Sequence, residues 1–174
     1  MSQHPVIRWT LSTFDDLNVR ALYALLQLRG EVFVVEQSCV FQELDGSDAV
    51  AMHLQGKVGD ELVAYARCFE PGVKYVEASI GRIVTRASHR GSGLGHALVE
   101  RALVTVSELW GPQAIRIGAQ ARLLTFYESH GFCDVGVPYL EDGIDHLEML
   151  WHPQACKRIN EKPSNSPSRH DHRL

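Results

Sequence analysis

The residues with the clearest capacity for chemistry lie in a glycine-rich stretch, Arg90-Gly91-Ser92-Gly93-Leu94-Gly95. An Ile- and Val-rich run from Ala78 to Thr85 precedes it and predicts a strand, and apolar residues at helical spacing follow it to about Trp110. Where a strand turns into a helix, unpaired backbone N–H groups and the helix dipole favour a bound phosphate. Glycine permits close approach of the backbone, and Arg90 adds a charged donor. The stretch therefore predicts a site for a phosphate-bearing cofactor.

Two common phosphate-binding loops do not fit this stretch. A P-loop requires Gly-Lys followed by Ser or Thr, and no such residues follow. A dinucleotide fingerprint that starts at Gly91 needs Gly or Ala where His96 lies, and one that starts at Gly93 needs it where Leu98 lies. On this stretch alone, a turn that only ends the strand is the alternative.

The stretch resembles the pyrophosphate loop of the GNAT acetyltransferases, whose pattern is Arg/Gln-x-x-Gly-x-Gly/Ala; Arg90, Gly93 and Gly95 match it. A second segment, Phe126-Tyr127-Glu128-Ser129-His130-Gly131-Phe132, resembles the Tyr-x-x-x-Gly-Phe signature of the same family. The resemblance spans about residues 6 to 151 and is greatest to the ElaA-like branch. Its matching pieces are Leu28-Arg29, Val32 to Gln37, Gln42 to Gly46, Leu62 to Arg67, Gly118 to Ala121 and Glu141 to Ile144.

This resemblance implies a mixed α/β fold, with a central, mostly antiparallel sheet flanked by helices, and acetyl-CoA as the acetyl donor. It implies that residues 90–95 hold the pyrophosphate and that the backbone of Ile83 and Val84 offers a strand edge to the pantetheine arm. Tyr127 would be the general acid that protonates the departing thiolate. Gln120 lies where the family often has Asn, and it can still offer an amide to that arm. Core packing is the alternative role for Ile83, Val84 and Tyr127.

No motif dictates the base that removes a proton from the amine. The candidates are Glu36, Glu43, Asp45, His53 and His146. His53 lies in an alternating strand, where a hydrogen-bonded structural role is the expectation, and His146 lies near a strand start, as a histidine does in ElaA-like chains. The acidic residues between positions 36 and 48, Asp48 included, would form either a pocket that attracts a cationic amine or a solvated loop. The sequence leaves both open.

The elements that must position these groups follow the order β-α-β-β-β-α-β-α-β-β. The predicted strands are 6–10, 51–58, 61–69, 78–85, 114–120, 132–137 and 144–151. The predicted helices follow capping residues at 13–16, follow the glycine stretch to about Trp110, and cover 123–130. Residues 36–50 are polar and predict an ordered loop with a short helix.

Composition limits the class of protein. The 174 residues suit one domain, and the formal charge of −4 does not favour nucleic-acid binding. No apolar run approaches the ~20 residues of a membrane span, and four cysteines without close pairing indicate a reduced, cytoplasmic protein. Nine scattered histidines give no metal-binding pattern.

We therefore expect a GNAT domain over residues 1–151. Residues 152–174 contain three prolines and more basic than acidic residues, and they predict a disordered tail, with an interaction tail as the alternative. The expected activity is acetyl transfer from acetyl-CoA to a primary amine by direct attack in a ternary complex. The acceptor is not identified by the sequence, and a homodimer is an expectation from the family only.

Two alternative functions are considered besides acetyl transfer. Arg29, Phe33, Glu43, Asp45 and Asp48 resemble a pattern of acyl-homoserine-lactone synthases, which bind an acyl carrier and S-adenosylmethionine. Those enzymes usually have Trp shortly after the Phe, whereas Val34 to Ser38 contains none. The second alternative is a non-catalytic module that binds acyl-CoA.

Overall fold

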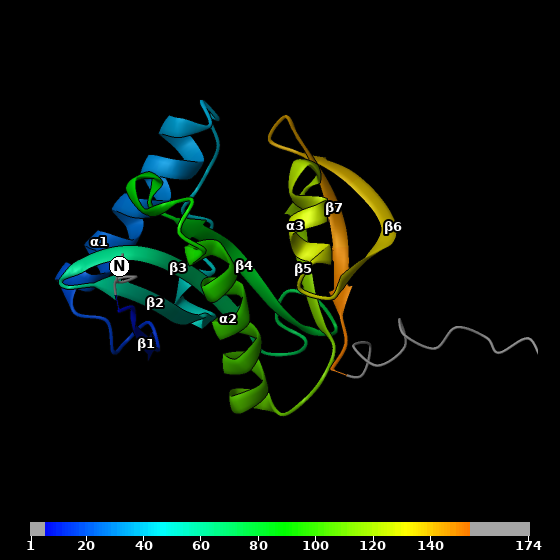
Figure 1. The fold of residues 1–174 in the computed structure, drawn as a ribbon, viewed down its shortest axis with the longest axis horizontal. Helices are drawn as coiled ribbons and strands as arrows, with labels where there is room; N and C mark the ends of the chain where they lie inside the picture. The colour runs from blue at the N-terminus through cyan, green and yellow to red at the C-terminus, as the bar shows by residue number, and fades with distance from the viewer. Residues whose placement is uncertain (1–5, 154–174) are drawn as a thin grey trace, which may run out of the picture.

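Seven strands form a single sheet in the order β1-β2-β3-β4-β5-β7-β6 in the computed structural model, which describes residues 6–153 (Figure 1). The strands are β1 (Arg8–Ser12), β2 (Met52–Val58), β3 (Glu61–Phe69), β4 (Ala78–Thr85), β5 (Ile115–Gln120), β6 (Phe132–Glu141) and β7 (Ile144–Trp151). The α-helices are α1 (Val19–Arg29), α2 (Leu94–Trp110) and α3 (Leu124–Glu128). The predicted order of elements is confirmed. Most of the predicted tail, 154–174, lies outside the described residues.

The predicted boundaries are wrong mainly at the N-terminus, at α3 and at β6. Strand β1 begins at Arg8, two residues later than predicted, α3 ends at Glu128, and β6 continues to Glu141, four residues beyond its predicted end. The cap of α1 is Asn18, whose Oδ1 accepts from the Ala21 N–H at 2.9 Å, and not one of residues 13–16. An Asn at this position satisfies one of the free N–H groups of the first turn.

A π-helix, η1 (Gly30–Glu36), continues α1 and was not predicted. Its wider turn is closed by bonds from the Gln37 N–H to the Val32 carbonyl at 3.3 Å and from the Cys39 N–H to the Val34 carbonyl at 3.1 Å. The β-branched valines of this segment disfavour a regular α-helix. The change of helix type begins directly after Arg29, which is fully buried.

Helices α1 and α2 pack on opposite faces of the sheet. On β3, Tyr65 joins the apolar cluster under α1, whereas Ala64 and Ala66 join the larger cluster under α2. Leu25 and Leu28 of α1 are fully buried in the first cluster. The α2 residues of the larger cluster are Leu94, Leu98, Val99, Ala102 and Val106. Both faces of the sheet are therefore covered by helices at its centre.

Strands β4 and β5 run parallel but pair only at their beginnings, where Ala78 lies beside Ile115 and Ser79 beside Arg116. Beyond these two pairs the strands diverge, and the two halves of the sheet separate (Figure 1). In β4 a bulge sets Arg82 and Ile83 against the single residue Ala66 of β3, and the φ of Arg82 is +50°. The divergence leaves one edge of β4 and one edge of β5 without a strand partner.

Among the described residues, no helix is long and apolar enough to cross a membrane.

Candidate active site

A cavity of about 610 Å³ lies where β4 and β5 diverge. It collects side chains from the end of η1, from β4, β5 and α3, and from the hairpin of β6 and β7. The predicted site residues that line it are Glu36, Asp45, Ile83, Val84, Arg90, Gly95, Gln120, Tyr127 and His146. Residues 91–94 lie on the adjoining loop, and His53 does not line the cavity.

The glycine loop enters α2 in a conformation that requires glycine. Gly91 and Gly93 have φ values of +80° and +83°, in the left-handed region that side chains disfavour. The Ser92 hydroxyl donates to the His89 carbonyl at 2.8 Å, and Leu94 is buried in the core below α2. The loop is therefore fixed at both ends, with the free N–H groups of the first turn of α2 beside the cavity. These groups suit a pyrophosphate.

Arg90 and Glu36 form an ion pair at the mouth of this cavity. Two guanidinium nitrogens of Arg90 contact the Glu36 carboxylate at 2.6 and 3.1 Å, and the Thr85 carbonyl accepts from the same side chain at 3.0 Å. The hydrogen bond from Arg90 lowers the pKa of Glu36. A carboxylate held in its ionised form takes up a proton poorly, so this pair argues against Glu36 as the general base.

The unpaired edge of β4 fits an extended amide chain. Its backbone groups from about Gly81 to Thr85 face the gap that β5 leaves, and Ile83 and Val84 lie in this segment. On the far side of the gap, the Gln120 amide donates to the Gln37 side-chain carbonyl at 3.0 Å. Pantetheine carries two amides in an extended chain, and an open strand edge offers the matching donors and acceptors.

Tyr127 is only 6% exposed, but it lines the cavity, and its hydroxyl makes no hydrogen bond within residues 6–153. The rings of Phe126 and Phe132 pack edge-on against it at 5.1 and 5.8 Å between centroids. Burial raises the pKa of Tyr127 to about 12, which keeps the phenol protonated at neutral pH. A fixed, unpaired and protonated phenol is suited to donate a proton or a hydrogen bond.

His146 lies opposite Gln120 in the β5–β7 pairing, at the wide end of the gap. Its Nδ1 lies 2.8 Å from the Ile144 carbonyl, which can only accept, so Nδ1 carries the proton in the neutral ring. The Nε2 lone pair is then free, 3.6 Å from the Glu141 carboxylate. Tyr139 stacks on the ring at 5.3 Å between centroids. These contacts present Nε2 as a proton acceptor toward the cavity.

His53 has the structural role that its strand position predicted. It is fully buried, and its Nε2 donates to the Asp48 carbonyl at 2.9 Å, which leaves Nδ1 to accept from the Tyr65 hydroxyl at 2.7 Å. Burial lowers the pKa of His53 and keeps the ring neutral. Both ring nitrogens are occupied away from the cavity, which argues against His53 as the base.

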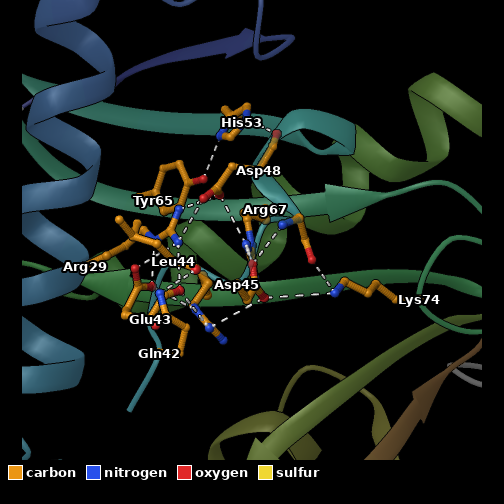
Figure 2. Close-up of polar contacts among 12 residues, drawn as sticks. Arg29, Gln42, Glu43, Leu44, Asp45, Asp48, His53, Tyr65, Arg67 and Lys74 are labelled. Carbon is orange, nitrogen blue, oxygen red and sulfur yellow. Dashed lines mark hydrogen bonds and ion pairs between the residues drawn. The ribbon is translucent and has the colours of Figure 1, made fainter. Parts of the chain in front are cut away.

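Below His53, acidic residues of the loop that follows η1 pair with arginines (Figure 2); Glu43 and Asp48 are buried, whereas 29% of the Asp45 side chain is exposed. Arg29 of α1 donates to Glu43 at 2.8 Å and to Asp48 at 2.6 Å, both nearly buried. Arg67 of β3 grips both oxygens of Asp45 at 2.8 and 2.9 Å. Neither the expected acidic pocket nor its alternative, a solvated loop, describes Glu43 and Asp48, because both are buried against arginines. We call the set of Arg29, Glu43, Asp45, Asp48, Arg67 and Arg82 the buried charge network.

The pKa shifts within the buried charge network follow from these pairs. The hydrogen bond from Arg67 holds the pKa of Asp45 well below its usual range. Burial alone would raise the pKa of Asp48, but the bonds and charges of Arg29 and Arg67 together outweigh it and lower the value. Glu43 and Asp45, two of the base candidates, are thus committed to arginines. The same pairs engage the residues that resemble the lactone-synthase pattern.

Several cavity residues were not predicted from the sequence. Lys74 and Tyr75 come from the loop before β4, Arg82 from its bulge, and Arg122 from the turn after β5. Tyr139 of β6 places its hydroxyl directly over Gly118 of β5, where a Cβ would collide with it. These residues share no motif spacing, since the fold alone brings them together.

The cysteines and the possible metal ligands give no second chemistry in this cavity. The thiol of Cys39 donates to the Asp142 carbonyl at 3.3 Å, and Cys68 is fully buried, which raises its pKa to about 12. Neither pairs with a histidine in the described part of the chain. Within residues 6–153, no three His, Cys, Asp or Glu side chains gather in a way that could hold a metal ion.

Comparisons with known proteins agree with this architecture. The family model described as an acetyltransferase (GNAT) domain matches residues 27–152, and the chain belongs to this family. It is 42% identical over 146 residues to the protein ElaA of Escherichia coli, with 83% of this chain and 95% of ElaA covered. The crystal structure of that ElaA superposes with a TM-score of 0.78, at 40% identity over 84% of this chain and 100% of the other. An acyl-CoA N-acyltransferase from Pseudomonas aeruginosa gives the same TM-score at 44% identity over 83% and 99% of the two chains.

Proposed function

We propose that this protein is an N-acetyltransferase that moves the acetyl group of acetyl-CoA to a primary amine by direct attack in a ternary complex. The observation that carries the proposal is the placement of three features on one cavity. A loop with free N–H groups, an unpaired strand edge and the unpaired hydroxyl of Tyr127 follow each other around it. This is the order of phosphate, amide arm and reacting sulfur along coenzyme A.

The side chains supply the proton transfers that such a reaction needs. His146 takes a proton from the acceptor ammonium at Nε2 and so produces the neutral, nucleophilic amine. That nitrogen attacks the thioester carbonyl carbon, and the carbon–sulfur bond breaks. Tyr127 donates its phenolic proton to the sulfur as it leaves. The new amide nitrogen then loses its extra proton to solvent, from which Tyr127 regains one. His146 releases to solvent the proton that it took from the ammonium, so that one proton is released overall and both side chains are restored.

Direct attack is favoured over an acetyl-cysteine intermediate. Cys68 is fully buried with a raised pKa, and the Cys39 thiol is engaged with a backbone carbonyl. A nucleophilic cysteine needs access and a group that stabilises its thiolate, and neither cysteine has both.

Two measurements on the purified chain test the proposal. Calorimetric titration should detect binding of acetyl-CoA and CoA but not of S-adenosylmethionine. Release of free CoA, followed with a panel of primary amines, should depend on the amine and should fall in the His146→Gln variant. Binding of S-adenosylmethionine would favour the lactone-synthase alternative. Coenzyme binding without transfer to any amine would favour the non-catalytic module.

A further inference from the structure

The wall of the cavity formed by β3, β4 and the loop between them carries an excess of positive charge. With Lys74, the buried charge network contains four cations and three carboxylates. Each carboxylate has an arginine partner: Asp48 contacts Arg29 and Arg67, and Glu43 contacts Arg29 and Arg82. Asp45 is held by Arg67, and it also lies 3.7 Å from Arg82 and 4.0 Å from Lys74 at the cavity wall. One positive charge is therefore left over. It lies on the side chains that reach the cavity.

Arg82 is the member of the buried charge network whose guanidinium is most available to a ligand in the cavity. Its Nε donates to Glu43 at 2.9 Å and its Nη2 to the Glu43 carbonyl at 3.2 Å, but Nη1 has no partner in the described chain and is open to solvent. The rings of Phe33 and Phe41 flank the guanidinium at 5.9 and 5.6 Å. The side chain is thus fixed with one face of its fork unused.

The backbone of Arg82 is strained in order to present this group. A φ of +50° is rare for a residue with a long side chain, so surrounding contacts must hold it. Lys74 adds a second cation beside the same end of the cavity, with 36% of its side chain exposed and its Nζ hydrogen-bonded to the Ser47 hydroxyl. Two donors of this kind match the oxygens of a carboxylate.

The opposite wall has the complementary chemistry. His146 presents its free Nε2 there, and Glu141 and Asp142 of the β6–β7 hairpin add two carboxylates that line the same cavity. This wall suits an ammonium group that must be attracted and then deprotonated. The gap between β4 and β5 lies between the two walls, so one small molecule with both charges can face both.

We propose that the acceptor is a small amine that also carries a carboxylate, of the amino-acid type, and that Arg82 and Lys74 select it by binding this carboxylate. The inference rests on the proposed acetyl transfer. The small size follows from the volume of about 610 Å³, which the acceptor shares with the amide arm of the donor. A polyamine would bring only positive charge to the wall of Arg82 and Lys74.

The test compares the twenty amino acids with their C-terminal amides as acceptors at saturating acetyl-CoA. The best amino acid should exceed its own amide in kcat/KM by about tenfold or more, because its carboxylate makes charged hydrogen bonds that the amide lacks. Lys74→Gln and Arg82→Gln should each remove about tenfold from this preference, mainly through KM. Both variants should lower kcat/KM for the acid by more than they lower it for the amide, so that the preference itself is the quantity that changes.

A matched control and a binding readout keep the outcomes distinct. Lys57→Gln removes a lysine of β2 that does not line the cavity, and it should leave the preference unchanged. If Arg82→Gln does not fold, Lys74→Gln carries the test alone. Thermal stabilisation of the CoA complex by N-acetyl amino acids, but not by their amides, should follow the same preference.

Equal use of acids and amides, or equal loss for both in Lys74→Gln, would overturn the carboxylate subsite and leave acetyl transfer intact. The same conclusion would follow if only polyamines or other amines without a carboxylate were acetylated. Absence of acetyl-CoA binding would instead remove the proposed function, and this inference with it.

Discussion

The two sides of this molecule treat their polar groups in opposite ways. On the α1 side, the buried charge network pairs each carboxylate with an arginine, and Glu43 and Asp48 are buried while 29% of the Asp45 side chain is exposed. At the gap between β4 and β5, the Tyr127 hydroxyl, the His146 Nε2 and one face of Arg82 are left without hydrogen-bond partners in the described chain. The first arrangement fixes positions, and the second supplies groups that can react or bind. Loss of a residue should therefore affect stability on one side and activity on the other.

The largest expected effect comes from cutting the buried charge network. Arg29→Leu leaves Glu43 and Asp48 without their main partner, and breaking a buried pair in this way costs about 3–5 kcal/mol in the free energy of unfolding. Urea denaturation measures the change. Arg20→Leu on the exposed side of the same helix is the control and should change stability by about 0.5 kcal/mol or less. Equal losses in the two variants would show that the pairs do not stabilise the fold.

At the gap between β4 and β5, Tyr127→Phe should lower kcat by about a hundredfold, because the sulfur of coenzyme A loses its proton donor. Stability and acetyl-CoA affinity should hardly change, since the hydroxyl has no protein partner to lose among residues 6–153. Single-turnover kinetics and calorimetry give the two quantities. Tyr23→Phe on the exposed part of α1 is the matched control. A wild-type rate for Tyr127→Phe would rule out the general acid.

The same contrast explains what the sequence could and could not predict. The sequence predicts the features that depend on adjacent residues. These are the order of elements, the glycine loop and Tyr127, which lies in a short motif. The roles of Glu43, Asp45 and Asp48 were not predicted, because burial and the arginine partners come from α1, β3 and β4, far away in the chain. Isolated carboxylates in a polar loop look the same whether they are solvated or paired.

The π-helix and the bulge in β4 escaped prediction for a related reason. Both add a residue to a regular element, and apolar periodicity over a few residues does not register one insertion. Arg82 owes its place in the cavity to that bulge, so no spacing in the sequence could identify it. The two histidines illustrate the same limit. Both His53 and His146 were base candidates in the sequence, and only their surroundings in the fold distinguish a structural role from a possible catalytic one.

A smaller effect should separate loop strain from cofactor binding. Gly93 and Gly59 both have positive φ values, +83° and +59°, and a Cβ at either would meet open space. Alanine at either position should cost about 1–2 kcal/mol of stability through backbone strain alone. Only Gly93→Ala should weaken acetyl-CoA binding, by about tenfold as the loop relaxes its strain. Equal affinities of the two variants for acetyl-CoA would mean that the glycine loop does not bind the donor.

The smallest effect concerns the pH dependence of stability that arises from His53 on the α1 side. His53 is neutral in the folded chain because burial lowers its pKa, whereas in the unfolded chain it takes up a proton near 6.5. The unfolded state then binds more protons below that pH, so stability present at pH 7.5 should be lost as the pH falls toward 5.5. The slope cannot exceed about 1.4 kcal/mol per pH unit for each such histidine.

His130 contributes to the same slope, because partial burial and the neighbouring His96 lower its pKa as well. Urea unfolding at three pH values should therefore give a shallower slope for His53→Gln and for His130→Gln than for the wild type. His152→Gln, which removes an exposed histidine after β7, should keep the wild-type slope. An unchanged slope in His53→Gln would mean that the ring is charged in the folded chain. In that case Tyr65 could not donate to Nδ1, and the hydrogen bond between these two side chains would not form.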